Sequence, residues 1–354
     1  MRSAFDAIVV GAGPAGSVTA LHLARRGVRV LLVDRCDFPR EKACGDGLTP
    51  RSVDILRALG IACACSGPPV VGIRLWDLRD GSRTGHGFRA TARGTTHGLV
   101  VSRDVLDDQI CAGARAAGAT FWPHTTVMAP LRRDDGAVCG IEARRDGRTI
   151  AVRAPITLVA DGAIGRLGRE LRGRADSGSD LELAVRQYAR GVSTIDRFEF
   201  FLPLVVERRV IPGYGWVFPA GDRVNIGAAF YDPTPVRTPN MLRRVYAEFL
   251  RGLRDIPRFS ALEATSPLIG APLRVGLDPP RCAGEGWTLV GDAAGVVNPF
   301  TGEGIAYALE SGELAAAAAW EALSQGHESA SHGYRRGLTR RYPPTWPSVA
   351  CCRV

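Results

Sequence analysis

The sequence predicts an α/β fold in which a Rossmann-like domain, built on a parallel sheet with a β-meander, carries an inserted antiparallel-sheet domain. Two observations support this prediction. An apolar strand, a glycine loop, a helix and a second apolar strand follow one another over 7–34. Alternating stretches with Gly and Pro breaks then separate this unit from a last strand, turn and helix over 287–323. The chain has 354 residues, 45% of them hydrophobic, which is enough for two joined domains.

The individual elements follow from hydrophobic spacing and from Gly, Pro and Ser punctuation. Helices are predicted over 17–26, 51–59, 102–117, 241–253 and 304–323. Strands are predicted over 7–10, 28–33, 72–76, 119–127, 137–143, 149–152, 156–160 and 287–290, with further strands between 181 and 230.

These elements predict three parts of the chain. The nucleotide-binding domain is discontinuous and comprises 1–68, 99–175 and 281–325. The inserted domain comprises 69–98 and 176–280 and is expected to bind the substrate. The remaining residues, 326–354, are predicted to form an irregular tail, because they are rich in proline and proline stops a helix.

The N-terminal glycine loop predicts a phosphate site. Gly11 permits a tight turn, Gly13 lets the main chain approach a pyrophosphate, and Gly16 lets the helix pack close to the strand. Asp34 ends the second strand about 20 residues later, where a carboxylate accepts ribose hydroxyls and repels a 2′-phosphate. We therefore predict that Gly11, Gly13, Ala15, Gly16 and Asp34 bind a dinucleotide other than NADP.

A second candidate cofactor site follows the last predicted strand. This strand delivers Gly291 and Asp292 to its carboxyl end, where a carboxylate can accept hydrogen bonds from a polyol. A turn at Gly302 leads into a helix that begins at Gly304 and Ile305, and its free N–H groups suit the pyrimidine side of a flavin. The pattern resembles the second FAD fingerprint of the hydroxybenzoate-hydroxylase-like flavoproteins, which makes FAD the predicted cofactor.

Three further positions extend this resemblance. Asp161 and Gly162 follow an apolar run and resemble the middle Asp-Gly motif of the superfamily, although Asp-Gly after a strand is also an ordinary turn signal. Arg103, at the start of a predicted helix, resembles the superfamily arginine that reaches FAD, with a solvated surface arginine as the alternative. Val127, at the end of an alternating segment, is also assigned to the cofactor site.

Composition excludes several classes of partner. The net charge of +9 comes from arginines scattered along the chain, whereas a nucleic-acid groove needs a clustered basic stripe. The nine cysteines form no CxxC pair and no zinc-like Cys/His spacing, so neither a metal site nor a disulfide framework is expected. The first strand leaves no room for a signal peptide, and no apolar run approaches a membrane span. A cytoplasmic protein is expected, with contact with the cytoplasmic face of a membrane left open.

Two longer stretches narrow the resemblance. Residues 38–51, FPREKACGDGLTPR, resemble the FPR-K-CG-GL-PR signature of the geranylgeranyl reductase family. Residues 212–219, PGYGWVFP, with 224–227, VNIG, resemble its Y-x-W-x-FP and NxG segment. The similarity extends from about residue 6 to residue 319. It is closest to the actinobacterial reductases that saturate part of the isoprenoid tail of menaquinone.

The resemblance implies a reductase in which reduced FAD delivers a hydride to a carbon–carbon double bond of a prenyl chain, while a proton is added at the other carbon. Gly45 and Gly47 would let their loop lie against the flavin. Cys44 resembles the family cysteine beside the flavin and is either a proton source or a small buried hydrophobe. Tyr214 and Trp216 alternate on one strand face and suit a wall along an apolar chain, with core packing as the alternative.

Two other functions stay open at this point. An FAD monooxygenase or other tailoring oxidase would use the same superfamily fold. The chain also ends sooner after its Ala-rich helix than family members of this type usually do, which leaves a truncated, non-catalytic flavin-binding protein as a second alternative. The electron donor, NAD(P)H or a reduced carrier, the prenyl substrate and the oligomeric state are not determined by these motifs.

Overall fold

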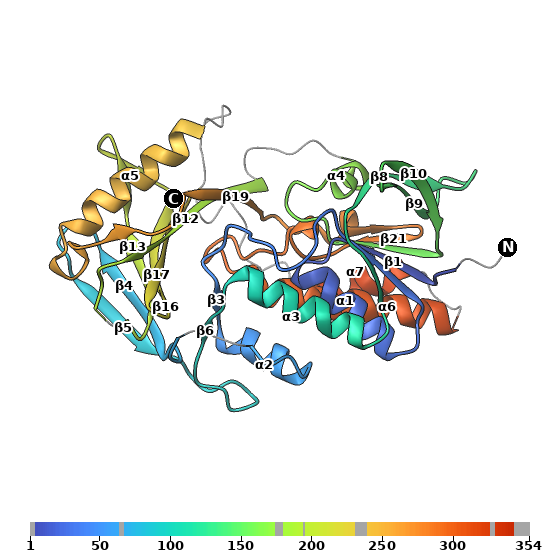
Figure 1. The fold of residues 1–354 in the computed structure, drawn as a ribbon, viewed down its shortest axis with the longest axis horizontal. Helices are drawn as coiled ribbons and strands as arrows, with labels where there is room; N and C mark the ends of the chain where they lie inside the picture. The colour runs from blue at the N-terminus through green and yellow to red at the C-terminus, as the bar shows by residue number, and fades with distance from the viewer. Residues whose placement is uncertain are drawn as a thin grey trace. The chain divides into compact units, whose positions relative to one another are not determined.

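The computed structural model describes residues 4–63, 67–173, 180–193, 195–230, 239–325 and 330–342. The chain divides into two compact units, each made of separate stretches of sequence (Figure 1). Unit 1 comprises Met1–Arg40, Asp107–Asp180 and Arg274–Cys351. The described residues of unit 2 lie in Glu41–Leu106 and Leu181–Leu273. Unit 1 holds a mainly parallel sheet and unit 2 a mainly antiparallel one, which confirms the predicted fold class.

The compact units differ from the predicted domains at their boundaries. The sequence places 41–63, 67–68 and 99–106 in the nucleotide-binding domain, whereas in the structure they belong to unit 2. It places 274–280 in the inserted domain, whereas they belong to unit 1. For the first group the reason is local pairing and packing. Strand β3 (Gly47–Leu48) pairs with β6 (Leu99–Val100), and Gly45 and Gly47 lie against side chains of the unit 2 sheet.

The main sheet of unit 1 has the strand order β20–β21–β11–β1–β2–β7. Its strands are β1 (Ala7–Val10), β2 (Val30–Val33), β7 (Thr120–Trp122), β11 (Ile156–Val159), β20 (Ala283–Gly284) and β21 (Trp287–Leu289). All neighbours pair in parallel except β20, which is antiparallel to β21 at the edge. Every residue of β1, β2 and β11 is buried, as expected for central strands of a parallel sheet that is covered on both faces.

Strand β7 corrects one expectation. The sequence places 119–127 in the β-meander, but β7 pairs in parallel with β2 and extends the main sheet. The meander itself consists of β8 (Thr125–Arg132), β9 (Val138–Arg145) and β10 (Arg148–Arg153), in the order β10–β9–β8. Strand pairing decides this point, because alternation along the chain does not distinguish an edge strand of one sheet from the first strand of another.

Unit 1 also contains helices. They are α1 (Pro14–Arg25), α3 (Arg103–Ala116), which begins in unit 2, α4 (Arg166–Arg172), α6 (Ile305–Gln325) and α7 (Ala330–Arg341), with short 3-10 turns η3 (Pro279–Cys282) and η4 (Gly291–Ala294). Helices α1 and α6 pack closely, since the Thr19 hydroxyl lies 3.3 Å from the Gly312 carbonyl oxygen and donates to it. The absence of a side chain at Gly312 allows this approach, since a Cβ there would lie 2.7 Å from the Ala15 carbonyl oxygen.

Helix α7 corrects the expectation of an irregular tail over 330–341. Its Tyr334 and Leu338 are four positions apart and fully buried, and the helix packs on α6. The prolines that stop a helix begin only at Pro343, beyond the end of α7. The rest of the predicted tail, 326–329 and 343–354, lies outside the described residues.

The main sheet of unit 2 has the order β18–β12–β17–β16–β13–β4–β5, with β19 also pairing β12. Its strands are β4 (Gly72–Asp77), β5 (Arg83–Gly87), β12 (Leu181–Arg190), β13 (Phe198–Leu202), β16 (Gly213–Ala220), β17 (Arg223–Phe230), β18 (Glu263–Ala264) and β19 (Ile269–Arg274). The pair β4–β13 is parallel. Smaller elements of the unit are the hairpin β14 (Leu204–Val206) and β15 (Arg209–Ile211), helix α2 (Pro50–Ala58) and turn η2 (Pro257–Phe259).

The two faces of this sheet pack differently. One face forms a large core with the predicted amphipathic helix, α5 (Pro239–Arg254), in which Phe201, Ile226 and Phe249 are buried. Because side chains alternate along a strand, the other face presents a second set of residues, described below as the site.

One carboxylate is buried within the α5-side core. Glu199 of β13 accepts hydrogen bonds from Arg74 at 2.7 Å and from the Trp76 indole, and Arg258 lies 3.4 Å from it. Replacing Glu199 by alanine is expected to lower the free energy of unfolding by about 3–5 kcal/mol, because two partly buried guanidinium groups and the buried Trp76 indole lose their shared partner. Urea unfolding measures this change.

The control for this prediction is Glu248, which pairs with Arg251 on the exposed side of α5. Glu248→Ala should change the free energy of unfolding by less than about 1 kcal/mol, since exposed ion pairs contribute little. Equal effects of the two substitutions would contradict the prediction.

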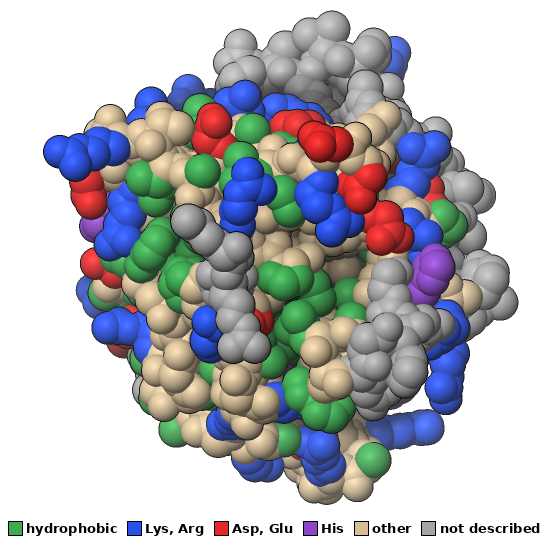
Figure 2. Space-filling view, turned by 90° about the vertical axis from the view of Figure 1, so that its right-hand side faces the viewer, with side chains coloured by type: hydrophobic (Ala, Val, Ile, Leu, Met, Phe, Trp, Pro, Cys, Tyr) green, Lys and Arg blue, Asp and Glu red, His purple; other side chains and the backbone are tan. Residues whose placement is uncertain are grey.

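The surface shows no concentration of positive charge on the face seen in Figure 2. Among the described residues of that face, Lys and Arg side chains are interspersed with acidic and hydrophobic ones. Within the described part of the chain, no helix is both long enough and apolar enough to cross a membrane.

Candidate functional site

The glycine loop of unit 1 joins β1 to α1 through very close backbone contacts. Gly11 has a φ of +96°, and a Cβ there would overlap the Ala160 carbonyl oxygen at the end of β11. A Cβ at Gly16 would overlap the carbonyl oxygen of Gly11. Helix α1 begins after Gly13, which has no side chain to cap it. No side chain of these glycines covers the first N–H groups of α1. These groups are therefore free to bind a phosphate.

Asp34 stands beside this loop, as predicted. Its Oδ2 accepts a hydrogen bond from the Ala12 N–H at 2.7 Å, and its Oδ1 accepts one from the Cys36 N–H at 2.9 Å. One carboxylate thus holds the glycine loop on the end of β2. A carboxylate has about four lone-pair positions, so Asp34 retains capacity to accept ribose hydroxyls.

The second predicted cofactor segment reaches the same part of unit 1. A Cβ at Gly291 would lie 2.7 Å from the Ala15 Cβ of α1, so the structure brings these two predicted positions together. Asp292 lies in the first turn of η4, directly after β21. The turn at Gly302 leads to Gly304, and α6 begins at Ile305 as expected.

Asn298 shapes this turn and was not among the predicted site residues. Its Oδ1 accepts hydrogen bonds from the Phe300 and Thr301 N–H groups at 2.9 and 3.1 Å. Its main chain bonds to Glu303 and Gly302. Because an Asn before Pro often initiates such a turn, its sequence context was a usable signal.

Asp161 has a structural role in unit 1. Its Oδ2 accepts a hydrogen bond from the Gly168 N–H at 3.0 Å, which places the carboxylate at the start of α4. Burial raises the pKa of this carboxyl. Gly162 makes the adjoining turn, and Val127 lies beside a bulge between β8 and β9. Cofactor contact by these three residues remains a prediction.

Arg103 belongs to unit 2 and is the first residue of α3. Only 6% of it is exposed, which does not fit a solvated surface arginine. Its charge acts on Cys44 and Asp46, where it lowers the pKa of both groups against the larger effect of burial. Direct contact with the cofactor remains a prediction.

Five aromatic side chains of β13 and β16 share the sheet face opposite α5, and we call this set the aromatic face: Phe198, Phe200, Tyr214, Trp216 and Phe218. Neighbouring rings are 4.6–6.2 Å apart between centroids. Phe200 and Tyr214 are only partly buried. The predicted alternation of Tyr214, Trp216 and Phe218 therefore produces a continuous apolar wall.

The Cys44 loop, residues 44–48, lies on this wall. A Cβ at Gly45 would be 3.1 Å from the Phe218 ring, and one at Gly47 would be 3.1 Å from the Phe198 ring. Within unit 2, both glycines therefore serve close packing of the loop on the aromatic face. Approach of the loop to a flavin remains a prediction.

The NxG segment positions Trp216 and the loop together. Asn225 of β17 is fully buried and accepts a hydrogen bond from the Trp216 indole at 2.9 Å. Its amide donates to the Cys44 carbonyl oxygen at 2.9 Å and to Asp46 Oδ2 at 2.8 Å. A Cβ at Gly227 would overlap the Trp216 ring, so glycine makes room for the indole.

The sequence reasoning did not assign Asp46 or Tyr188 to the site. Asp46 is 1% exposed, and its Oδ2 also accepts a hydrogen bond from the Tyr188 hydroxyl at 2.5 Å. Its N–H donates to the Cys44 sulfur at 3.3 Å. Burial raises the pKa of Asp46 to about 6 and raises the pKa of the Cys44 thiol. An Asp inside a glycine loop was the available signal, since Asp tolerates the left-handed φ of +61° found here.

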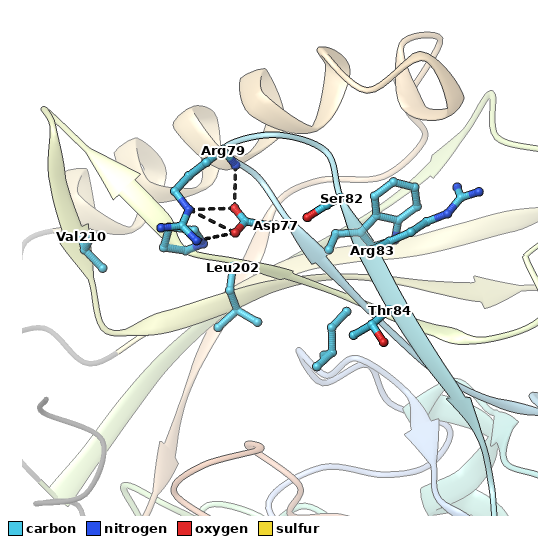
Figure 3. Close-up of a pocket in the computed structure, with 10 residues that line it drawn as sticks. Asp77, Arg79, Ser82, Arg83, Thr84, Leu202 and Val210 are labelled. Carbon is cyan, nitrogen blue, oxygen red and sulfur yellow. Dashed lines mark hydrogen bonds and ion pairs between the residues drawn. The ribbon is translucent and has the colours of Figure 1, made fainter.

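A separate hollow of about 550 Å³ opens on unit 2 between β4, β5 and the β14–β15 hairpin (Figure 3). Leu75, Leu202 and Val210 contribute its apolar lining, and the ion pair of Arg79 with Asp77 lies at its edge. Neither Cys44 nor Asp46 lines this hollow.

Known proteins with similar sequences cover nearly the whole chain. The FAD binding domain family matches residues 4–194. A menaquinone reductase of Mycolicibacterium smegmatis is 36% identical over 370 residues, covering 96% of this chain and 83% of the relative. Digeranylgeranylglycerophospholipid reductase 1 of Methanopyrus kandleri is 32% identical, covering 97% and 86%. The chain belongs to the geranylgeranyl reductase family of FAD-dependent oxidoreductases.

A solved structure from this geranylgeranyl reductase family has the same fold. The geranylgeranyl bacteriochlorophyll reductase-like protein of Thermoplasma acidophilum matches with a TM-score of 0.83 at 26% identity, covering 95% of this chain and 83% of that one. Flavin-dependent halogenases also share the fold, at identities of 22%, which shows the fold alone.

FAD is the cofactor of this geranylgeranyl reductase family member, and unit 1 fits it. The side-chain-free cradle at Gly11, Gly13 and Gly16 suits a pyrophosphate, and Asp34 suits a ribose. The α6 N-terminus suits the electron-rich edge of a reduced flavin.

Proposed function

We propose that the protein is an FAD-dependent reductase that saturates a carbon–carbon double bond of a prenyl chain. The observation that carries this proposal is the aromatic face of unit 2, with the Cys44 loop packed on it. An apolar wall joined to buried proton-holding groups suits an isolated alkene, which needs a hydride and a proton. When bound and reduced, FAD supplies the hydride.

The residues of unit 2 have separate tasks in this reaction. The partly buried rings of Phe200 and Tyr214 offer the aromatic face to an apolar chain and exclude water from it. Trp216 is held in place by Asn225. The raised pKa of Cys44 keeps its thiol protonated at neutral pH, so Cys44 can hold the proton that the alkene carbon receives.

A prenyl lipid is the proposed substrate class. The relatives named menaquinone reductase and digeranylgeranylglycerophospholipid reductase support this choice. Unit 2 also exposes several large apolar side chains on β4 and the β14–β15 hairpin, among them Ile73, Leu75, Val205 and Val210. Such a cluster suits contact with the surface of a membrane that holds the substrate, and we propose a cytoplasmic protein that makes this contact.

Anaerobic turnover tests the proposed function. The purified FAD-loaded protein is reduced without oxygen and mixed with vesicles containing menaquinone or a geranylgeranyl lipid. We expect the flavin to reoxidise and the lipid to gain two hydrogens by mass. Failure of every prenyl lipid to reoxidise the flavin would contradict the proposal and support a non-catalytic flavin-binding protein.

The alternative function is an FAD monooxygenase or other tailoring oxidase. Its basis is the fold, which flavin-dependent halogenases share. The same preparation separates the two functions when oxygen is admitted. Substrate-dependent oxygen consumption with an oxygenated product would favour the oxidase over the reductase.

A further inference from the structure

We propose that Asp46 supplies the proton that Cys44 passes to the prenyl chain, so that the two residues form a proton relay within unit 2. The inference rests on the proposed function, because it names the source of the second hydrogen in the same reaction. Cys44 is the residue that faces the substrate in this scheme, and Asp46 acts through it.

The geometry makes Oδ1 of Asp46 the oxygen that holds the proton. Oδ2 already accepts two hydrogen bonds, from Tyr188 at 2.5 Å and from Asn225 at 2.8 Å. Oδ1 is buried and has no hydrogen-bond partner among the described residues. Protonation of Oδ1 would remove the negative charge and so lower the cost of this buried oxygen. The loop turn holds Asp46 next to Cys44, since the Asp46 N–H donates to the Cys44 sulfur.

Arginine charges and hydrogen-bond donors from three elements act on Asp46, and burial outweighs them. Arg186 and Tyr188 act from β12, Asn225 from β17 and Arg103 from α3, and each lowers the pKa of Asp46. Burial still raises that pKa to about 6. The pKa of the Cys44 thiol is raised mainly by burial and further by the negative charge of Asp46. The positive charges of Arg103 and Lys42 lower it.

The arginine charge near Asp46 is partly neutralised. Arg186 donates to Glu41 at 2.6 Å and stacks on Tyr188, 4.3 Å from the ring centroid. Arg223 lies on the same ring at 3.8 Å. Tyr188 therefore links Asp46 to two guanidinium groups.

The relay balances in two steps. As the hydride reaches one alkene carbon, the Cys44 S–H bond breaks and its proton forms a C–H bond at the other carbon. The thiolate left behind takes the Oδ1 proton of Asp46, because the thiol has the higher pKa. Tyr188 and Asn225 stabilise the resulting carboxylate through their donated hydrogen bonds. Water returns a proton to Asp46 once the product leaves.

Asp46→Asn tests the relay in steady-state anaerobic turnover with excess chemical reductant. In the unmodified protein we expect the rate to fall as the pH rises through about 6 or higher, because the acid form of Asp46 is required. Asp46→Asn should remove this dependence and lower the steady-state rate by about 100-fold. The first turnover should keep its amplitude, because Cys44 already carries one proton.

Tyr188→Phe provides a second variant that keeps the carboxyl. It removes a donor that stabilises the ionised form, so the pKa of Asp46 rises and the fall in rate moves to higher pH. A merely structural role for Asp46 would not produce this shift.

Alkylation of Cys44 provides a readout without turnover. Trypsin releases residues 43–51, a peptide whose one cysteine is Cys44, after Lys42 and Arg51. In Asp46→Asn the neighbouring negative charge is lost, so the thiol should ionise at lower pH and react faster with iodoacetamide. The matched control is Asp54→Asn, which removes another buried carboxyl of unit 2, bonded to Thr95. It should leave both the pH profile and the alkylation rate unchanged.

The outcomes separate the two proposals. If the unmodified protein reduces prenyl lipids but Asp46→Asn keeps its pH profile and Cys44 reactivity, the relay is wrong and the proposed function stands. If the unmodified protein reduces no prenyl lipid at any pH, both are overturned.

Discussion

Replacing Gly16 by alanine is expected to weaken FAD binding strongly. A Cβ at this position would overlap the Gly11 carbonyl oxygen and lie 3.2 Å from the Ala160 Cβ. The Gly11 oxygen is a main-chain atom and Ala160 directly follows β11, so neither can move easily. Helix α1 must therefore move away from the loop. A cost of about 3 kcal/mol, at the upper end for overpacking, corresponds to an affinity roughly 100-fold lower.

Titration of apo-protein with FAD, followed by flavin fluorescence, measures this loss. Circular dichroism shows whether the variant remains folded. Gly252→Ala is the control, because Gly252 lies inside α5 and a Cβ there would meet no atom within 4 Å. That substitution should stabilise the helix by up to about 1 kcal/mol and leave FAD affinity unchanged. Full FAD content in Gly16→Ala would show that α1 does not need this close approach.

Replacing Asn225 by alanine is expected to destabilise unit 2 and to abolish prenyl reduction. The buried Asn225 side chain makes three hydrogen bonds, to Trp216, to the Cys44 carbonyl and to Asp46. Its removal leaves these partners unsatisfied, at about 1–3 kcal/mol for a buried group. We expect the free energy of unfolding to fall by about 3–5 kcal/mol and prenyl reduction to be lost, because the Cys44 loop separates from the aromatic face.

Two measurements check this result. Urea unfolding gives the change in stability, and Cys44 alkylation should accelerate as the loop becomes free. Gln187→Ala is the matched control. Gln187 also carries a side-chain amide, but it lies on the α5 side of the sheet, where the amide donates to the Ser266 carbonyl oxygen at 2.7 Å. It should lower stability without changing Cys44 alkylation. Similar alkylation rates in both variants would show that Asn225 does not hold the loop.

Part of the candidate site was predictable because its causes are local. The Gly11–Gly16 spacing, the strand before it and Asp34 after it all lie within one strand–helix–strand unit. Backbone geometry over such a short stretch depends on residue type, so glycine and carboxylate positions predict the phosphate and ribose contacts. The second cofactor segment follows the same logic at Gly291 and Asp292.

Other features depended on pairings that spacing does not reveal. Whether β7 extends the main sheet or the meander, and whether β4 runs parallel to β13, depends on the partner strand. The formation of α7 depends on burial of Tyr334 and Leu338 against the rest of unit 1. Local propensity is a weak prior where tertiary contacts provide most of the stabilisation.

The sequence by itself predicted a dinucleotide-binding Rossmann-like unit, and its motifs carried the resemblance to FAD-binding geranylgeranyl reductases, because those signatures lie in short stretches of chain. Only the tertiary structure decided that Asp46 joins Cys44 in a buried acid cluster. Its partners Tyr188 and Asn225 lie 142 and 179 positions away in the chain. The sheet of unit 2 brings them together, and removal of water then changes the proton affinity of Asp46.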